Sequence, residues 1–519
     1  MAQLSHKARF DKYRDDAVIS KCLQYAKWTL PQLMVDPLSG GIGITNVVER
    51  DYQEIGPMLV NNLAAKLTAL LFPSSRPFFE GEYGEEVAKR AEARGVQTDE
   101  LRDELSRLTL RACKRLFRNA AYAQLVQATR HLITTGNVLT HRDSGTQRIT
   151  TYGLQSFAVQ RDGSGVAMDV VLREGTYFSA LSPEIQKTLR ITHPDKYRRA
   201  DETTAVELYT RIARKLSRRG RNYFVVSQEV DDIAVGTPGQ YPEHLCPFQV
   251  ITWNLIAGEN YGRGLVEDYA GGFAKLSDLS EAAALYGIET MRVINLVAPG
   301  SGADIDEIAT AESGQYVQGS PESVKSFESG SGQKLAVVRD EISDVFGNLA
   351  RAFMWKANTR DAERVTAYEL RLDAQEADNV LGGTYSSLAE TWQVPMAHIL
   401  MHEEKPALLE GILTDNIKLD IIAGVPALGR SIELQNLMNA AQDAAAIVPA
   451  FAQLSKRVDQ ERLFKLIMSL SNVDIKEFEK SKEQMRADAQ AALAAQQGAS
   501  QMMTAESGVN TATGLQNLA

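Results

Sequence analysis

The chain opens with hydrophobic residues at helical spacing. Between Pro57 and Pro73, four leucines recur every three or four residues and so share one face of a predicted helix: Leu59, Leu63, Leu67 and Leu70. Proline is tolerated in the first turn of a helix and stops a helix elsewhere, so the two prolines mark the ends. A longer helix is predicted over residues 98–135, where Gly136 ends it.

The pattern then changes to short β-rich runs separated by turn residues. Two runs flank Asp162 and Gly163, and a second pair flanks Arg219 and Gly220, which predicts two β-hairpins. The second turn is basic and could contact an acidic partner, although a solvated turn is the more common explanation. Its cations are Arg214, Lys215, Arg218, Arg219 and Arg221.

Long helical seams follow from Gly264 onward. One helix is predicted over residues 264–292, and two further segments carry apolar residues every three or four positions. The first contains Leu335, Val338, Ile342, Val345, Leu349 and Ala352, and the second contains Leu370, Ala374, Ala377, Leu381, Tyr385, Leu388 and Trp392. Such narrow seams suit ordinary core helices or long helices packed side by side. Several in one chain, interrupted by Gly271-Gly272 and Gly382-Gly383, favour helices packed around an axis in an oligomer.

Between the first two long helices, residues 293–332 are rich in Gly and Ser. Short strand candidates occur there at residues 313–319 and 323–329, which predicts a small inserted α/β module. The end of the chain, residues 482–519, is rich in Ala, Gln and Ser and can bury little apolar surface. We expect this tail to be partly disordered, over about its last twenty residues. The whole pattern predicts an α+β fold that is mainly helical.

Composition narrows the function. The 519 residues carry a net charge of −10, and an acidic balance argues against a protein that coats nucleic acid over its whole surface. Three cysteines with no CxxC spacing predict free thiols in a reducing compartment: Cys22, Cys113 and Cys246. The charged N-terminus does not resemble a signal peptide, and no apolar run reaches the roughly 18 residues of a membrane span. We therefore expect a soluble protein with no membrane partner.

Candidate chemistry is sparse. No GxxxxGK[ST] phosphate loop occurs, so an ATP-driven motor is not expected. His398 and His402 lie one helical turn apart and could face a metal, but Ile399 stands where the HExxH motif has glutamate. A metal-dependent nucleic-acid enzyme is the hypothesis that this pair would support, and metal analysis would test it. We expect no catalytic residue, no metal site and no cofactor.

The most unusual local pattern is the segment KANTRDAERVTAYELRL, residues 356–372. Three cations at four-residue spacing precede a helix start: Lys356, Arg360 and Arg364. The helix start is a capping box of Thr366 and Glu369, supported by a hydrophobic staple of Val365 and Leu370. A helix N-terminus already carries about half a positive charge, so Arg364 beside it lowers stability by some tenths of a kcal/mol. A residue that opposes the stability of its own helix, as Arg364 does here, is expected mainly at functional sites.

The order of these features resembles the portal proteins (head-to-tail connectors) of short-tailed, podovirus-type bacteriophages. Short sequence words run in the family's order along most of the chain. They are VNNLAAKLTALLFP (60–73), TTGNVL (134–139), VQRDGSG (159–165), GENYGRGLVEDY (258–269), ERVTAYELR (363–371), LGGTYSSLAETWQVP (381–395) and ALGRSIEL (427–434). Each word is weak alone, and the set is specific.

The resemblance implies a portal-type subunit that assembles into a twelve-membered ring at one capsid vertex of the virion, after assembly in the host cytoplasm. Double-stranded DNA would pass through its channel without sequence preference. Terminase, major capsid protein, tail adaptor and internal core proteins would be its partners. The implied regions are a wing (1–263), first stem helix (264–292), clip (293–332), second stem helix (333–357), tunnel loop (358–365) and a long helix with crown (366–481).

Within this resemblance, Arg360 and Arg364 are the expected channel cations. Repeated around a ring, arginines and helix N-termini would form a collar that binds phosphates. Lys356 continues the seam of the second stem helix and could instead lie along a neighbouring helix. The family pattern commonly has glycine where this chain has Ala362, which puts a valve-like movement in doubt. A virion adaptor or scaffold that never contacts DNA is the alternative.

Overall fold

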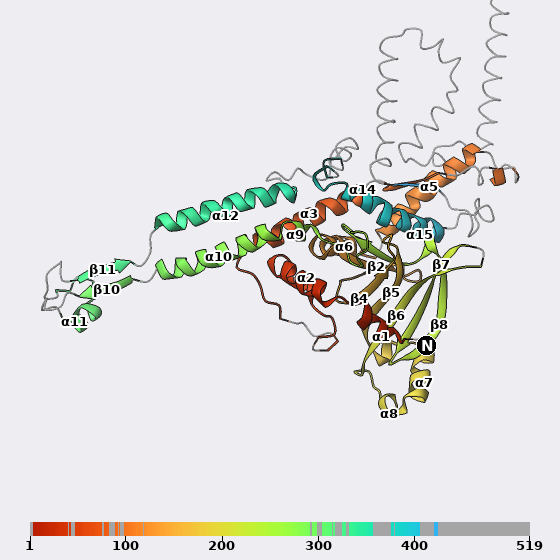
Figure 1. Cartoon of the computed structure of the whole chain (residues 1–519), viewed down its shortest axis with the longest axis horizontal. Helices are drawn as coiled ribbons and strands as arrows, with labels where there is room; N and C mark the ends of the chain where they lie inside the picture. The colour runs from red at the N-terminus through yellow and green to blue at the C-terminus, as the bar shows by residue number, and fades with distance from the viewer. Residues whose placement is uncertain are drawn as a thin grey trace, which may run out of the picture. The chain divides into compact units, whose positions relative to one another are not determined.

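The computed structural model describes most of the first of two compact units, Met1–Ile432 and Glu433–Ala519, and none of the second. The described residues are 4–39, 41–42, 47–74, 77–82, 89–91, 93, 98–117, 119–218, 220–290, 293–297, 304–313, 315–316, 324–328, 332–355, 375–377, 379–404 and 420–423. Figure 1 shows helices and sheets in both halves of this unit, so the fold is mixed helix and sheet.

The principal helices follow the chain order. They are α1 (His6–Tyr13), α2 (Asp16–Trp28), α3 (Ile55–Leu71), α5 (Thr98–Leu116), α6 (Ala121–Thr135), α7 (Pro183–Thr192), α8 (Pro194–Tyr197), α9 (Leu265–Asp268), α10 (Ala270–Thr290), α11 (Ile305–Thr310), α12 (Gly332–Ala352), α14 (Thr384–Leu388) and α15 (Val394–Glu404). A π-helical turn, Ala389–Gln393, joins the last two.

The strands form four antiparallel sheets among the described residues. Their bounds are β1 (Phe79–Glu82), β2 (Asn137–Arg142), β3 (Ile149–Tyr152), β4 (Phe157–Arg161), β5 (Ala167–Tyr177), β6 (Ala205–Leu216), β7 (Asn222–Val230), β8 (Ile233–Pro242), β9 (Phe248–Thr252), β10 (Val293–Val297), β11 (Val324–Glu328) and β12 (Asp420–Ala423). The sheet orders are β4-β5-β6-β7-β8, β3-β2-β9, β10-β11 and β1-β12. Both predicted hairpins are confirmed, as β4–β5 and β6–β7.

Helix α3 is the centre of the main core. Its four predicted leucines, Leu59, Leu63, Leu67 and Leu70, are all buried, so the predicted helix face is confirmed. The same core also takes in residues from α2, α6, α10, α12, α14 and α15. Thr68 contributes a buried hydroxyl that shares a hydrogen bond with Thr129 of α6, at 2.9 Å.

The helix predicted over residues 98–135 is two helices, so that prediction was wrong. Asn119 and Ala120 both adopt left-handed backbone conformations, with φ of 58° at each residue, and they separate α5 from α6. Neither glycine nor proline marks this break in the sequence. Asparagine tolerates the left-handed region and alanine does not, which explains why residue preferences gave no warning.

Two of the sequence words quoted above meet at a backbone contact. Gly136 ends α6 with φ of 74°, and a Cβ atom there would lie 2.5 Å from the backbone nitrogen of Gly264. Asn137 then exchanges two hydrogen bonds of 2.7 Å with the backbone of Gly262. Glycine is required here because any side chain would separate the two backbones.

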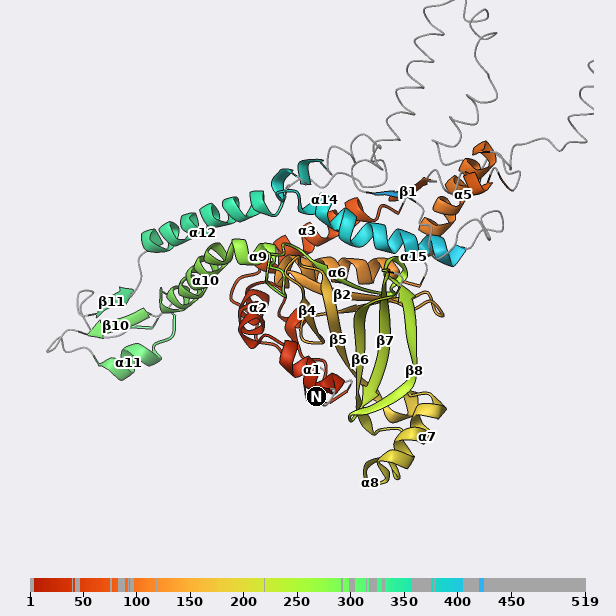
Figure 2. The same cartoon turned by 45° about the vertical axis from the view of Figure 1, so that its right-hand side comes forward.

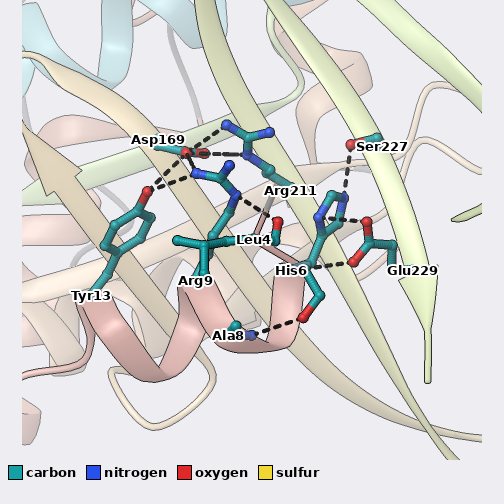
Figure 3. Close-up of polar contacts among 10 residues, drawn as sticks. Leu4, His6, Ala8, Arg9, Tyr13, Asp169, Arg211, Ser227 and Glu229 are labelled. Atoms are coloured by element: carbon teal, nitrogen blue, oxygen red, sulfur yellow. Dashed lines mark hydrogen bonds and ion pairs between the residues drawn. The ribbon is translucent and has the colours of Figure 1, made fainter. Parts of the chain in front are cut away.

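The N-terminal helix α1 is fastened to the five-stranded sheet by buried polar groups. Figure 3 shows Arg9, Tyr13 and Arg211 converging on the Asp169 carboxylate. The shortest of these hydrogen bonds, from Arg211 Nη2, is 2.7 Å. His6 lies beside them, between Glu229 and Ser227 of β7, and burial lowers the pKa of its imidazole.

A second buried ion pair joins α15 to the three-stranded sheet. Arg142 of β2 donates two hydrogen bonds of 2.8 Å to the Glu403 carboxylate, and both side chains are almost completely buried. Arg115 of α5 pairs with the adjacent Glu404 at 2.8 Å. The last turn of α15 is therefore held by two arginines from elements that are distant in sequence.

We expect replacement of Glu403 by glutamine to destabilise the protein by about 3–5 kcal/mol, because it leaves the buried Arg142 guanidinium without a counter-charge. The measurement is the unfolding midpoint in denaturant. Glu259→Gln is the matched control, because Glu259 pairs with Arg263 at the exposed surface and should barely change the midpoint. Equal effects of the two substitutions would contradict the prediction.

A second expectation concerns acid. Burial lowers the pKa of the His131 imidazole from its usual 6.5 to about 4. The unfolded chain therefore takes up this proton first, so stability is retained above pH 6.5 and is lost as the pH falls towards 4, by about 3 kcal/mol in total. Thermal midpoints between pH 7 and pH 4 measure the loss.

His131→Gln should flatten this pH dependence, and the same substitution at the exposed His193 should not. Some slope should remain in the His131 variant, because burial also lowers the pKa of His6 and of His141. An unchanged slope in His131→Gln would show that another group causes the acid sensitivity.

Candidate nucleic-acid interface

The residues predicted to contact DNA or to support that contact lie outside the described part of the chain. They are Lys356, Arg360, Arg364, Val365, Thr366, Glu369 and Leu370. What the structure describes is the protein on either side of this basic segment, residues 356–374. The described chain ends at Trp355, after α12, and resumes at Gln375, before α14.

The upstream support is the C-terminal end of α12. This helix ends at Ala352, five residues before the predicted end of the second stem helix at residue 357. Met354 adopts a left-handed conformation with φ of 52°, and its N–H bonds to the Arg351 carbonyl. The Trp355 N–H bonds to the Ala350 carbonyl at 2.7 Å, which completes a Schellman motif. Glycine usually takes the left-handed position, so methionine concealed this helix end in the sequence.

The seam of α12 is confirmed only towards this end. Val345 and Leu349 are buried, whereas Val338 is partly exposed. Phe353 continues the buried face and packs edge-on against Phe273 of α10, with ring centroids 5.6 Å apart. The seam therefore ends at the Schellman motif, before Lys356.

The downstream support begins with a turn at Gly382 and Gly383. Both have positive φ, of 64° and 83°, so the break expected at this glycine pair is confirmed. After it, Tyr385 and Trp392 are completely buried, and Trp392 packs edge-on against Phe72 at 5.0 Å. The apolar residues predicted for this seam from Ala377 onward are all buried, although the π-helical turn divides the helix.

Both supports are attached to the same helix, α3. Lys66 Nζ donates a hydrogen bond of 2.7 Å to the carbonyl of Met354, at the upstream end. Tyr385 OH donates to the Leu70 carbonyl at 3.3 Å, and Gln393 Nε2 donates to the Leu71 carbonyl. The last carbonyls of a helix have no partner within it, so these two side chains satisfy the C-terminal end of α3.

This arrangement also explains why a non-glycine residue is tolerated at the end of α12. A left-handed methionine costs about 1–3 kcal/mol of backbone strain, so it persists only where the surrounding contacts fix it. The Lys66 ammonium lies against the carbonyl end of α12, where the helix carries partial negative charge. A cation is favourable there, and its hydrogen bond fixes the Met354 backbone.

The helices α10 and α12 run side by side away from this anchor, as both views show (Figures 1 and 2). Gly272 permits their close approach, because a Cβ atom there would lie 3.2 Å from Leu349. Lys275 pairs with Glu341 across the two helices. Ser277 of α10 donates a hydrogen bond of 2.7 Å to Asp51, which precedes α3.

The far end of this helix pair carries the predicted inserted module. Strands β10 and β11 pair in antiparallel register from Val293–Glu328 to Val297–Val324, and α11 lies between them in sequence. The strand predicted at residues 323–329 is confirmed as β11. The candidate at residues 313–319 lies mostly outside the described residues, and residues 315–316 are not in a strand.

The first predicted stem helix also differs from expectation. Residues 264–292 contain a short α9 and then α10, with a break at Tyr269. The Tyr269 ring packs against Phe353 at 6.1 Å, so the break turns an aromatic side chain towards the end of α12. The interruption expected at Gly271-Gly272 is therefore wrong, because both glycines lie inside α10 and the break comes before them.

Three kinds of group could take part in a reaction: cysteine thiols, histidines and clusters of metal ligands. Burial raises the pKa of each thiol, Cys22, Cys113 and Cys246, to about 12, so none is a thiolate nucleophile near neutral pH. The His398 ring packs edge-on against the His244 ring, with centroids 5.5 Å apart. In the part of the chain that the structure describes, no three His, Cys, Asp or Glu side chains are placed to hold a metal ion. In that same part, no helix is long and apolar enough to cross a bilayer.

The sequence pattern revealed the basic segment but not the groups that fix the described residues before and after it. Lys66 stands on a leucine-rich helix as a single cation, and Tyr385 and Gln393 belong to an apolar seam. Their partners lie 288 to 322 residues away in the chain, beyond any local pattern. One signal was available in the sequence. Helix α3 is followed by Phe72 and Pro73, and neither side chain can satisfy its last carbonyl groups, so partners from elsewhere in the chain were to be expected.

Comparison with known proteins gives extensive matches. A family model described as bacteriophage head to tail connecting protein matches residues 10–478. The portal protein of Pseudomonas phage phiKMV is 42% identical over 511 residues, which cover 96% of this chain and 98% of that relative. The portal protein of Enterobacteria phage SP6 is 30% identical over 435 residues, covering 84% of this chain and 81% of the relative.

Among solved structures, the neck of an empty GTA particle matches with 14% identity and a TM-score of 0.33, covering 80% of this chain and 90% of that one. That similarity is too low to support an argument. The family match over nine-tenths of the chain and the near full-length relative do support one, and the sequence words found above lie within the matched region. The chain therefore belongs to the bacteriophage head to tail connecting proteins, and its function is that of a portal protein.

Proposed function

We propose that copies of this chain form a ring at one vertex of the phage capsid, and that its channel conducts double-stranded DNA during packaging, retention and ejection. The observation that carries the proposal is the 42% identity to a phage portal protein over 96% of the chain. The role is structural, and no residue is assigned a catalytic function.

The described elements suggest how the regions divide. Residues 1–263 would form the wing, α10 and α12 the stem, and β10, β11 and α11 the clip. The basic segment would supply the tunnel loop, residues 358–365, and residues 366–481 a long helix and crown. The paired α10 and α12 and the hairpin-like module at their far end support the stem and clip assignments.

Exposed apolar residues on the stem support assembly into a ring. Leu285 and Ile288 of α10 are 56% and 70% exposed, and Val337 of α12 is 67% exposed. Such residues are costly in water and would be covered by a neighbouring copy. Twelve copies is the subunit number that the resemblance implies.

We assign the DNA contact to Arg360 and Arg364, with Lys356 as a flanking cation. Attachment of both ends to α3 would hold the intervening segment in place while leaving its cations free for phosphates. Contacts of this kind are independent of sequence and weaken as salt is raised. Three acidic residues are exposed on α10: Asp278, Glu281 and Glu289. The proposed channel would therefore be mainly acidic, with cations at only a few positions.

The remaining partners follow from the connector function. The β10–β11 module is the proposed contact for the tail adaptor and the terminase. The wing and crown would meet the major capsid protein and the internal core proteins. The proposed location is the virion vertex, with assembly in the host cytoplasm.

Electron microscopy of the purified protein in negative stain tests the proposal directly. End-on views should show rings with a central hole wide enough for a DNA duplex. Monomers or dimers at all protein concentrations would contradict the ring. Rings without DNA passage in a packaging reaction would instead favour an adaptor that never contacts DNA.

Replacing Arg360 and Arg364 together by alanine removes the proposed collar. We expect rings of unchanged size and at least equal stability, because Arg364 opposes the dipole of the following helix. Packaged DNA should leak from the particle or be packaged in lower yield, and the defect should grow as salt screens the remaining phosphate contacts. Packaging yield and DNA retention across a salt series measure this.

Lys66→Met provides a second arm that leaves both arginines in place. It removes the hydrogen bond to the Met354 carbonyl, so the basic segment loses one support and DNA retention should fall while rings persist. Normal packaging and retention by the double alanine variant at all salt concentrations would refute the DNA contact. Failure of that variant to form rings would place the arginines at a subunit interface.

A further inference from the structure

A small basic module sits at one end of the five-stranded sheet. Helices α7 and α8 pack together and cover the ends of β6, β7 and β8, far from α15 at the other end of the sheet (Figures 1 and 2). The module has its own apolar core, in which the Phe178 and Tyr197 rings stack with centroids 5.4 Å apart. It is therefore a fixed part of the fold.

The helix α7 has two distinct faces. Leu189 is fully buried and Ile185 packs beside it, so this face is turned to the module's core. Lys187, Arg190 and Ile191 stand at spacings of three and four residues, which places them together on the opposite face. All three are exposed, and Ile191 is 70% exposed.

The module is strongly basic in an acidic chain. Residues 183–200 contain five Lys or Arg (Lys187, Arg190, Lys196, Arg198 and Arg199) against two acids (Glu184 and Asp195), a net charge of +3, whereas the whole chain carries −10. Lys196 is paired with Asp231. Among the described residues, no carboxylate forms an ion pair with any of the other four cations.

Part of this charge is held in position before any partner arrives. The Arg190 guanidinium lies over the Phe178 ring, 5.2 Å from its centroid. Cation–π contact restricts the arginine side chain, so less conformational freedom is lost when it binds an anion. Arg190 is therefore presented rigidly beside the exposed Ile191.

We propose that the outer face of α7 binds an acidic protein segment, whose carboxylates contact Lys187 and Arg190 and which seats one apolar side chain on Ile191. An apolar anchor surrounded by charge is the layout of a protein interface. A DNA backbone would satisfy the cations but would leave Ile191 in contact with phosphates. The surface lies on a different part of the chain from the proposed channel cations.

The full-length protein can be titrated with a fluorescent peptide of glutamates around one central leucine. The same peptide with glycine in place of leucine and a short labelled DNA duplex serve as comparison ligands. We expect the leucine peptide to bind most tightly to α7, and Lys187→Glu and Ile191→Ser each to weaken it by about fivefold to tenfold.

Arg218→Glu is the matched control, because Arg218 is an exposed cation in the β6–β7 turn at the other end of β6. It should leave peptide binding unchanged. No binding by the wild type, equal binding of the leucine and glycine peptides, or no effect of Ile191→Ser would overturn the proposal. Duplex binding that Lys187→Glu abolishes would show a phosphate-binding surface instead.

Discussion

The described structure depends most on the C-terminal end of α3. A buried helix end leaves carbonyl groups that must find partners, and here the partners come from residues more than 300 positions later, Tyr385 and Gln393. The same helix supplies Lys66 to the end of α12. Helix α3 is therefore joined to the described residues before and after the basic segment by polar groups that cannot be left unsatisfied.

Residue spacing and turn residues predicted the elements whose structure depends on neighbouring positions in the sequence. The leucine face of α3 and the two hairpins followed from spacing and turn residues, because burial on one side imposes a period on the sequence. The failures occur where a residue adopts a conformation against its preference. Ala120 and Met354 are left-handed without being glycine, and Lys66 holds Met354 in place through a hydrogen bond to its carbonyl.

The candidate site shows the same division. The cations of residues 356–372 stand out in sequence because they oppose the dipole of the helix predicted to follow them, and their contact with DNA is a proposal. Their supports could not be predicted, because Lys66 and Tyr385 look like ordinary members of helical faces until distant carbonyls are placed beside them. The Arg142–Glu403 pair was equally hidden, since nothing near either residue marks it as buried.

The hydrogen bonds that join α3 to the described residues on either side of residues 356–374 have a consequence for engineering. The entropy of closing a chain segment between fixed ends grows slowly with its length, by about 0.6 kcal/mol for each doubling. Insertions between Trp355 and Gln375 would leave the anchoring hydrogen bonds of α3 untouched. In the proposed ring, this interval would therefore be the natural place to graft a peptide sensor, with one copy contributed by every subunit.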